Sequence, residues 1–290
     1  MQLIIDISYG FVLFLMIAYG FAIFYRVMGF FHMAHAIALT LGAYLVYTGC
    51  IVLAWPLWLS ILLSVAFVVF FMVLVNGGVY QSIMKRGVDG WKLMIVSLGI
   101  YVVLQNVVSL AWGDGTMTFR TWPVKPGHTI FGGIITDVQI ITIAVSALLI
   151  CAVWWLLEKT NIGMSIKATA SNPSLSDMLG VKKGTVSALS IGLGSALMAC
   201  AGILIAADVD MTPTMGFDWL MYGVVAMIIG GMGKMRYMVL GAFLLAMAQQ
   251  LSAYFLDAKW MNATAYVILV FFLYFKPFGF SGKKLKKAEV

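Results

Sequence analysis

Apolar residues occupy nine long runs of the chain, and polar or charged residues are gathered between them. The runs cover approximately residues 4–25, 33–53, 57–79, 93–112, 138–157, 185–207, 217–233, 237–256 and 260–276. Each is long enough to cross or nearly cross a bilayer as an α-helix, which needs about 20 apolar residues. A transmembrane β-barrel would show short segments of alternating polarity instead. The pattern therefore predicts an all-α polytopic membrane protein with about eight or nine transmembrane helices.

The second run is the least regular of the nine. It begins in the polar stretch 32–35 and contains Gly42 and Gly49. If it crosses the membrane, nine spans place the N-terminus outside and the C-terminus inside. If it is re-entrant or broken, eight full spans place both termini inside. The pattern leaves both topologies open.

Composition narrows the class of protein. Of the 290 residues, 63% are hydrophobic and 10% are charged, and the mean hydropathy is +1.02. An ordinary soluble domain has about 25% charged residues and needs a polar surface. These figures exclude a soluble enzyme, a disordered chain and a nucleic-acid-binding protein, although the net charge is +7. The cysteines Cys50, Cys151 and Cys200 lie in apolar runs without zinc-type spacing, so no disulfide framework is expected.

Lysine and arginine are distributed unevenly between the two sets of loops. Fifteen of the 18 fall in segments 26–32, 80–92, 158–184 and 234–236 and from residue 276 onwards, whereas Arg120, Lys125 and Lys259 do not. Because positive residues concentrate in cytoplasmic loops, these segments are predicted to be cytoplasmic, including the basic tail 277–290. The long loop at about 113–137 is then external, and its length makes it a candidate docking surface.

The cytoplasmic loop at about 158–184 carries signals for a short helix. Asn172 is a good N-cap, Pro173 suits the first helical position and Gly180 suits a left-handed C-terminal stop. Between them Leu175, Met178 and Leu179 share one face. So short a helix is marginal alone, so this apolar face predicts a partner groove. The alternatives are that the helix packs on its own protein or lies in the lipid interface.

This loop resembles the coupling loop of the branched-chain amino-acid permease family of ABC importers, which also includes urea permeases. The positions that match the family pattern are Gly163, Lys167, Ala168, Asn172, Pro173, Leu179, Gly180 and Val181. Lys167 stands where the family usually has Arg, and Ser171 stands where an acid is frequent. Both departures leave the ends of the predicted helix intact.

Three further stretches are similar to the same family, in the same order along the chain. Residues 29–35 and 41–44 resemble its Asn-Phe-Ala-His-Gly-Glu segment, with His35 in the place of the His and Ile37 in the place of the Glu. Residues 97–99 with 104–106 resemble a second stretch, and residues 213–217 with 230–233 resemble a third. The resemblance covers about residues 10–280.

The resemblance implies a single transmembrane permease domain over residues 1–290, in the plasma (inner) membrane, that moves a small polar solute into the cytoplasm. Branched-chain or other amino acids and urea are the solutes it suggests. It implies a second homologous permease or a second copy, two ATPase subunits that bind ATP and Mg, an external solute-binding protein and surrounding lipid, with no nucleic acid and no cofactor in this chain. The loop residues named above, with Leu175 and Met178, would contact the ATPases.

Four polar residues inside apolar runs are candidates for the translocation path. His32 and His35 would share a helix face, and each is either a structural histidine hydrogen-bonded between helices or a group that contacts the solute. A metal site is not expected, because His128 is the only other histidine. The amides Gln105 and Asn106 are expected to face the protein interior or a wet path, so they either bond between helices or line the path.

The glycines near residue 230 have a structural and a catalytic interpretation. Gly230, Gly231 and Gly233 allow either close helix packing or a break in the span. The string ending in Gly233 and Lys234 lacks the glycine and hydroxyl residue of a phosphate-binding loop. ATP hydrolysis is therefore expected on separate subunits, and this chain is not expected to be an enzyme.

An ion-driven transporter or channel is the rival interpretation. Such proteins usually carry an ionisable residue inside the spans. Here every Asp, Glu, Lys and Arg lies at a predicted helix end or in a loop. The distribution of charge therefore favours a permease that is driven by other subunits.

Overall fold

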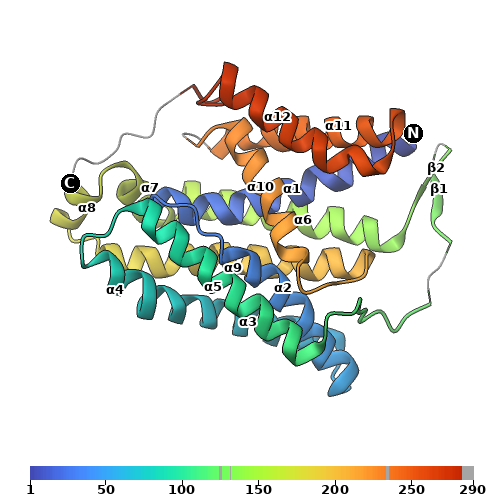
Figure 1. The fold of residues 1–290 in the computed structure, drawn as a ribbon, viewed down its shortest axis with the longest axis horizontal. Coiled ribbons are helices and arrows are strands. Elements are labelled where there is room, and N and C mark those ends of the chain that lie inside the picture. Colours follow the sequence, from blue (N-terminus) through green and yellow to red (C-terminus); the bar gives the residue numbers. More distant parts are fainter. Residues whose placement is uncertain (124–125, 131, 233–234, 283–290) are drawn as a thin grey trace. The chain divides into compact units, whose positions relative to one another are not determined.

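The computed structural model describes residues 1–123, 126–130, 132–232 and 235–282 (Figure 1). In chain order the elements are α1 (Gln2–Met28), α2 (His35–Tyr47), the π-helix η1 (Thr48–Val52), α3 (Leu57–Val75), the π-helix η2 (Asn76–Tyr80), α4 (Gln81–Met84), α5 (Gly90–Trp112), β1 (His128–Ile130), β2 (Gly133–Ile135), α6 (Asp137–Lys159), α7 (Asn161–Ser171), α8 (Pro173–Met178), α9 (Lys183–Asp208), α10 (Met215–Gly230), the 3-10 helix η3 (Met235–Tyr237), α11 (Met238–Phe255), the 3-10 helix η4 (Ala258–Trp260) and α12 (Met261–Phe275). The predicted all-α fold is confirmed, with one short antiparallel hairpin, β1 and β2, in the long loop before α6.

Eight helical stretches of the described chain are long and apolar enough to cross a membrane. They are Gln2–Met28, His35–Val52, Leu57–Met84, Gly90–Trp112, Asp137–Lys159, Lys183–Asp208, Met235–Phe255 and Ala258–Phe275. Helix α10 is also apolar, but it has only 16 residues. The shorter apolar segment is α10, whereas the second run, whose topology the pattern left open, forms one 18-residue stretch of α2 and η1.

The described residues form two compact units. The first comprises residues within Met1–Tyr19, Thr121–Cys151 and Trp219–Leu285, and the second comprises those within Gly20–Arg120 and Ala152–Asp218. Helices α1, α6 and α10 contribute residues to both. The single permease domain over residues 1–290 stays a prediction.

The core of the second unit is the pair α2 and α9, which lie side by side (Figure 1). Their backbones approach at glycines: a Cβ on Gly42 would lie 2.8 Å from the Cα of Ala199, and one on Gly202 would lie 2.0 Å from the carbonyl oxygen of Leu39. Lipid tails supply no hydrophobic force between helices, so close packing at small residues is what associates them.

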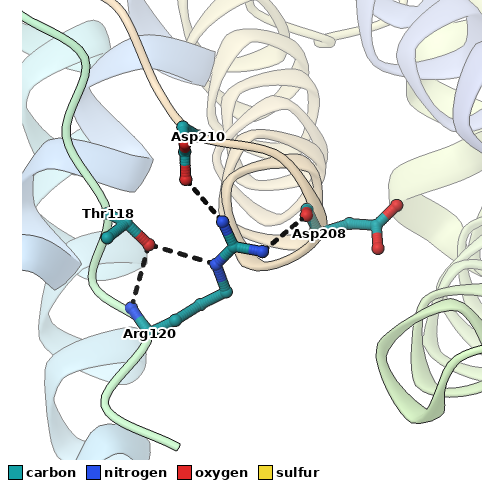
Figure 2. A network of polar contacts seen from close by, with 4 residues as sticks. All are labelled: Thr118, Arg120, Asp208 and Asp210. Carbon is teal, nitrogen blue, oxygen red and sulfur yellow. Dashed lines mark hydrogen bonds and ion pairs between the residues drawn. The ribbon is translucent and has the colours of Figure 1, made fainter. Parts of the chain in front are cut away.

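One end of the second unit is closed by polar contacts between loops. The indole of Trp112, at the end of α5, donates to Thr48 Oγ1 at 2.9 Å. Met117 and Met211 exchange two backbone hydrogen bonds. These bonds join the segment before β1 to the segment after α9. Arg120 completes this contact: it donates to the carbonyl oxygen of Asp208 at 2.9 Å and pairs with the carboxylate of Asp210 (Figure 2).

The first unit is also packed through glycines. A Cβ on Gly223 would lie 2.3 Å from a side-chain carbon of Ile17, and one on Gly241 would lie 2.2 Å from the carbonyl oxygen of Ala226. Helix α12 packs on α11, where Thr264 donates to Ser252 at 2.8 Å. The helix also carries exposed Val267, Val270 and Phe271, as expected of a helix in contact with lipid.

Gly202→Ala is expected to destabilise the second unit. The new methyl group has no room beside Leu39, so α2 and α9 must separate at a cost of roughly 1–3 kcal/mol. Thermal unfolding of the purified protein in detergent measures this. Gly99→Ala is the matched control, because an added Cβ there meets nothing within 4 Å. Equal unfolding temperatures for the two variants would contradict the proposed role of the glycine contact.

Candidate functional site

The loop between α6 and α9 folds into two helices, α7 and α8 (Figure 1). Helix α7 was missed at the sequence level. Its signal is Thr160, an N-cap whose hydroxyl accepts from the backbone N–H of Gly163 at 3.3 Å. Gly163 is required here for another reason, because a Cβ on it would lie 2.3 Å from the carbonyl oxygen of Leu157. The glycine therefore lets α7 fold back tightly against the end of α6.

Helix α8 has the predicted caps. The side chain of Asn172 accepts from the N–H of Leu175 at 3.0 Å, Pro173 is the first helical residue and Gly180 has a φ of +86°. Only a residue without Cβ adopts that left-handed conformation without strain. The helix Pro173–Met178 is thus fixed at both ends, as the sequence predicted.

The apolar face of α8 is exposed. Leu175, Met178 and Leu179, hereafter the apolar ridge, are 53%, 84% and 75% exposed. Beside this face, Ser176 is buried, and its hydroxyl lies 3.3 Å from the hydroxyl of Thr169 on α7. The helix therefore does not bury its ridge in the described part of its own chain, which removes one of the two alternatives.

Lys167, the basic residue of the loop pattern, forms an ion pair with Glu158. Its Nζ lies 2.6 Å from a carboxylate oxygen at the end of α6. At the other end of the loop, Gln81 donates to the carbonyl oxygen of Gly184 at 3.2 Å, in the first turn of α9. The ridge is thus carried on a loop that is attached to membrane-crossing helices on both sides.

His32 and His35 lie together in the interior of the second unit. Both are fully buried, and their ring centroids are 5.2 Å apart. His35 Nε2 lies 3.4 Å from the hydroxyl of Ser195 on α9, and Tyr80 packs on His32 at 4.7 Å between centroids. This contact across helices fits the structural alternative. Neither ring nitrogen of His32 finds a hydrogen-bond partner within the described chain.

The amides Gln105 and Asn106 do not join the histidines. Ser97 on α5 faces the histidine-bearing linker, where it accepts from the N–H of Met33 at 3.0 Å. Asn106 is nine residues further on, about two and a half turns, and so lies on the opposite face of the helix. It is exposed, and its amide donates to Val102 and Gln105 of its own helix. Of the two alternatives, Asn106 does not face the interior of this chain, and its place on a wet path stays a prediction.

Gly230 and Gly231 combine the two roles considered for them. A Cβ on Gly230 would lie 2.5 Å from the Cα of Met238, so this glycine packs α10 on α11. Gly231 has a φ of +91° and ends the helix. Gly233 lies outside the described residues. Among those described, no group of three or more His, Cys, Asp or Glu side chains is arranged to hold a metal ion.

A comparison with known families identifies the chain. The sequence profile described as "Branched-chain amino acid transport system / permease component" matches residues 3–275. The chain belongs to this permease family. It is therefore a multi-pass membrane protein and a transport component.

Individual relatives agree with the family assignment. The permease BraD of Pseudomonas aeruginosa, of a high-affinity branched-chain amino-acid transport system, is 24% identical over 272 residues, which cover 89% of this chain and 88% of BraD. LivH of Escherichia coli is 27% identical over 197 residues, or 66% of this chain and 63% of LivH. LsrC of Yersinia pestis, an autoinducer 2 import permease, is 31% identical over a shorter stretch, 44% of this chain and 39% of LsrC.

A solved structure shares the fold of the permease. PsaBC from Streptococcus pneumoniae, in complex with Fab, aligns with a TM-score of 0.53 at 10% identity, over 96% of this chain and 93% of that chain. At that identity the likeness supports the helical architecture alone.

Asn172→Ala is expected to loosen α8 without affecting the spans. The N-terminal amides lose their side-chain acceptor, at a cost of about 1 kcal/mol. Hydrogen exchange at the amide of Leu175 should accelerate accordingly. Asn172→Asp keeps an acceptor at the cap and is the control; acceleration in both variants to the same extent would show that the cap does not hold the helix.

Proposed function

We propose that this chain is the permease subunit of an ATP-binding-cassette importer for a small polar solute. The apolar ridge of α8, exposed on a loop attached to α6 and α9 in a chain of this family, is the observation that carries the proposal. Branched-chain amino acids are the first candidates, because BraD and LivH are both named for them. Other amino acids and urea follow.

The ridge has the chemistry of a protein contact. Three large apolar side chains on a capped helix bury well in a groove, and Ser176 keeps them facing outward. Two ATPase subunits, which bind ATP and Mg, would each grip one permease at the ridge. Closure of the ATPases on ATP would move α8, and the attachments of the loop would deliver this movement to α6 and α9. No cofactor is assigned to the permease itself.

The exposed face of α5 is proposed as the contact with a second permease. Asn106 is surrounded on this face by exposed Val102, Val103 and Leu110. The Nδ2 group of Asn106 donates within α5, but a polar amide in contact with lipid is still costly. A second permease would offer this amide a further partner or a wet path. Gln105 lies beside it. The solute would therefore pass between two permeases, and the buried pair His32 and His35 would support the helices around the path.

The orientation follows from charge. The loop carrying α7 and α8 would be cytoplasmic together with the C-terminus, and the segment 113–137 would face an external solute-binding protein. The contacts of Arg120 with Asp208 and Asp210 hold the start of that segment against the end of α9. This would give the binding protein a fixed surface. The inner membrane is the location that this arrangement implies.

Leu179→Asp is expected to weaken association with the ATPase below what co-purification retains, while the protein still inserts in the membrane. A carboxylate in an apolar groove would weaken the contact roughly 30-fold, as for an interface residue worth about 2 kcal/mol. Co-purification of the nucleotide-binding subunit from detergent extracts measures it, with Leu179→Met as the matched control. Unaltered co-purification would remove the docking role of the ridge, and uptake by the isolated chain on an ion gradient alone would favour the ion-driven rival.

Asn106→Cys is expected to form a cross-link between two permeases, either two copies or this chain and its homologue. Cys50, Cys151 and Cys200 are replaced first, so that one thiol remains. Val267→Cys on α12, which is 66% exposed, is the control and should stay uncross-linked. Cross-linking through position 267 in preference to position 106 would place the permease contact on α12 instead.

A further inference from the structure

A pocket of about 270 Å³ lies where three helical segments end or begin in the second unit. Its walls are Met28 at the end of α1, Gln81, Met84 and Lys85 in and just after α4, and Lys183 and Ser187 in the first turns of α9. Gly184 completes the wall beside Lys183. The pocket is separate from the apolar ridge and from the proposed path, and neither of them explains it.

Two lysines, Lys85 and Lys183, line this pocket. Lys85 and Lys183 form no ion pair with a carboxylate in the described chain, whereas Lys92 pairs with Asp89 and Lys167 with Glu158. Like charges at one pocket repel each other unless an anion lies between them. The charge pattern therefore selects a negatively charged occupant.

The first turn of α9 adds further attraction for an anion. The N-cap of this 26-residue helix is Lys182, which makes no side-chain capping hydrogen bond. The first backbone N–H groups of a helix need an acceptor, and the helix dipole favours negative charge there.

The position of the pocket favours a lipid over a free anion. The ends of two spans and the start of a third meet here, which is the depth of the headgroups at a membrane surface. Met28 and Met84 give the pocket an apolar side next to its basic side. A molecule with an anionic head and an apolar body matches both sides.

We propose that this pocket binds the phosphate of an anionic phospholipid headgroup, with Lys85, Lys183 and the first amides of α9 as its donors. The bound headgroup joins α4 to the first turn of α9, which directly follows α8 and Gly180. An anionic lipid in the leaflet at this end of the helices therefore stabilises the contact between α4 and the first turn of α9, where the loop carrying α7 and α8 joins the spans. This role is independent of the solute and of the ATPase.

The test uses the full chain in nanodiscs of phosphatidylcholine, with and without phosphatidylglycerol. Native mass spectrometry measures retained phosphatidylglycerol, and thermal unfolding measures its stabilising effect. Wild type is expected to retain the lipid and to unfold at higher temperature in its presence. The pair Lys85→Gln and Lys183→Gln should lose affinity by about fivefold per lysine, and the rise in unfolding temperature should disappear. Lys183→Gln alone should lose about fivefold in lipid affinity.

The matched control is the pair Arg86→Gln and Lys182→Gln, which removes the same charge from the same two segments at residues that do not line the pocket. This pair should keep most of the lipid binding. Equal losses in the two pairs would overturn the site in favour of general surface attraction. Inorganic phosphate added to phosphatidylcholine nanodiscs should not raise the unfolding temperature; an equal rise would overturn the lipid in favour of a free anion.

Discussion

The direct approach of helix backbones at glycine is the constraint on which the second unit depends. In a bilayer, water does not drive apolar helices together, so their association rests on contact area and on hydrogen bonds. At Gly42 and Gly202 the backbone of one helix occupies the space that a side chain would need. The same close packing gives His35 its place, because a Cβ on Gly194 would lie 3.1 Å from its ring. The buried histidine pair is thus a consequence of how tightly α9 packs.

Irregular backbone inside this unit is stabilised by side chains of neighbouring helices. Ser97 accepts from the N–H of Met33 in the linker between α1 and α2. The side chain of Asn76, in the π-helical turn η2, accepts from Ser187 on α9, and this contact between side chains ties the turn to α9. Non-helical or widened backbone is tolerated at membrane depth only where protein or water satisfies it. Ser97 thus satisfies a backbone group of the linker, and Ser187 holds the η2 turn against α9.

The sequence predicted what depends on local chemistry. Asn172, Pro173 and Gly180 define α8 by capping rules alone, and the nine apolar runs correspond to eight long helical stretches and α10. Thr160 could have predicted α7 by the same rule. Asn106 could not be placed, because periodicity does not say which side of α5 meets another chain. The sequence also could not predict that Lys85 and Lys183 line one pocket, because nearly a hundred residues separate them and only tertiary packing joins α4 to α9.

Helix α9 is continuous from Lys183 to Asp208, a length of about 39 Å at 1.5 Å per residue. Its first turn adjoins the coupling loop, and the carbonyl oxygen of its last residue accepts from Arg120. This one helix therefore has the proposed ATPase contact near its N-terminal end and the Arg120 contact at its C-terminal end. An α-helix is stiff along its axis, so a displacement of its N-terminal end along the axis would also displace its C-terminal end. A helix of this length is long enough to cross a bilayer, so the movement proposed for α8 would reach the Arg120 contact without a hinge inside α9.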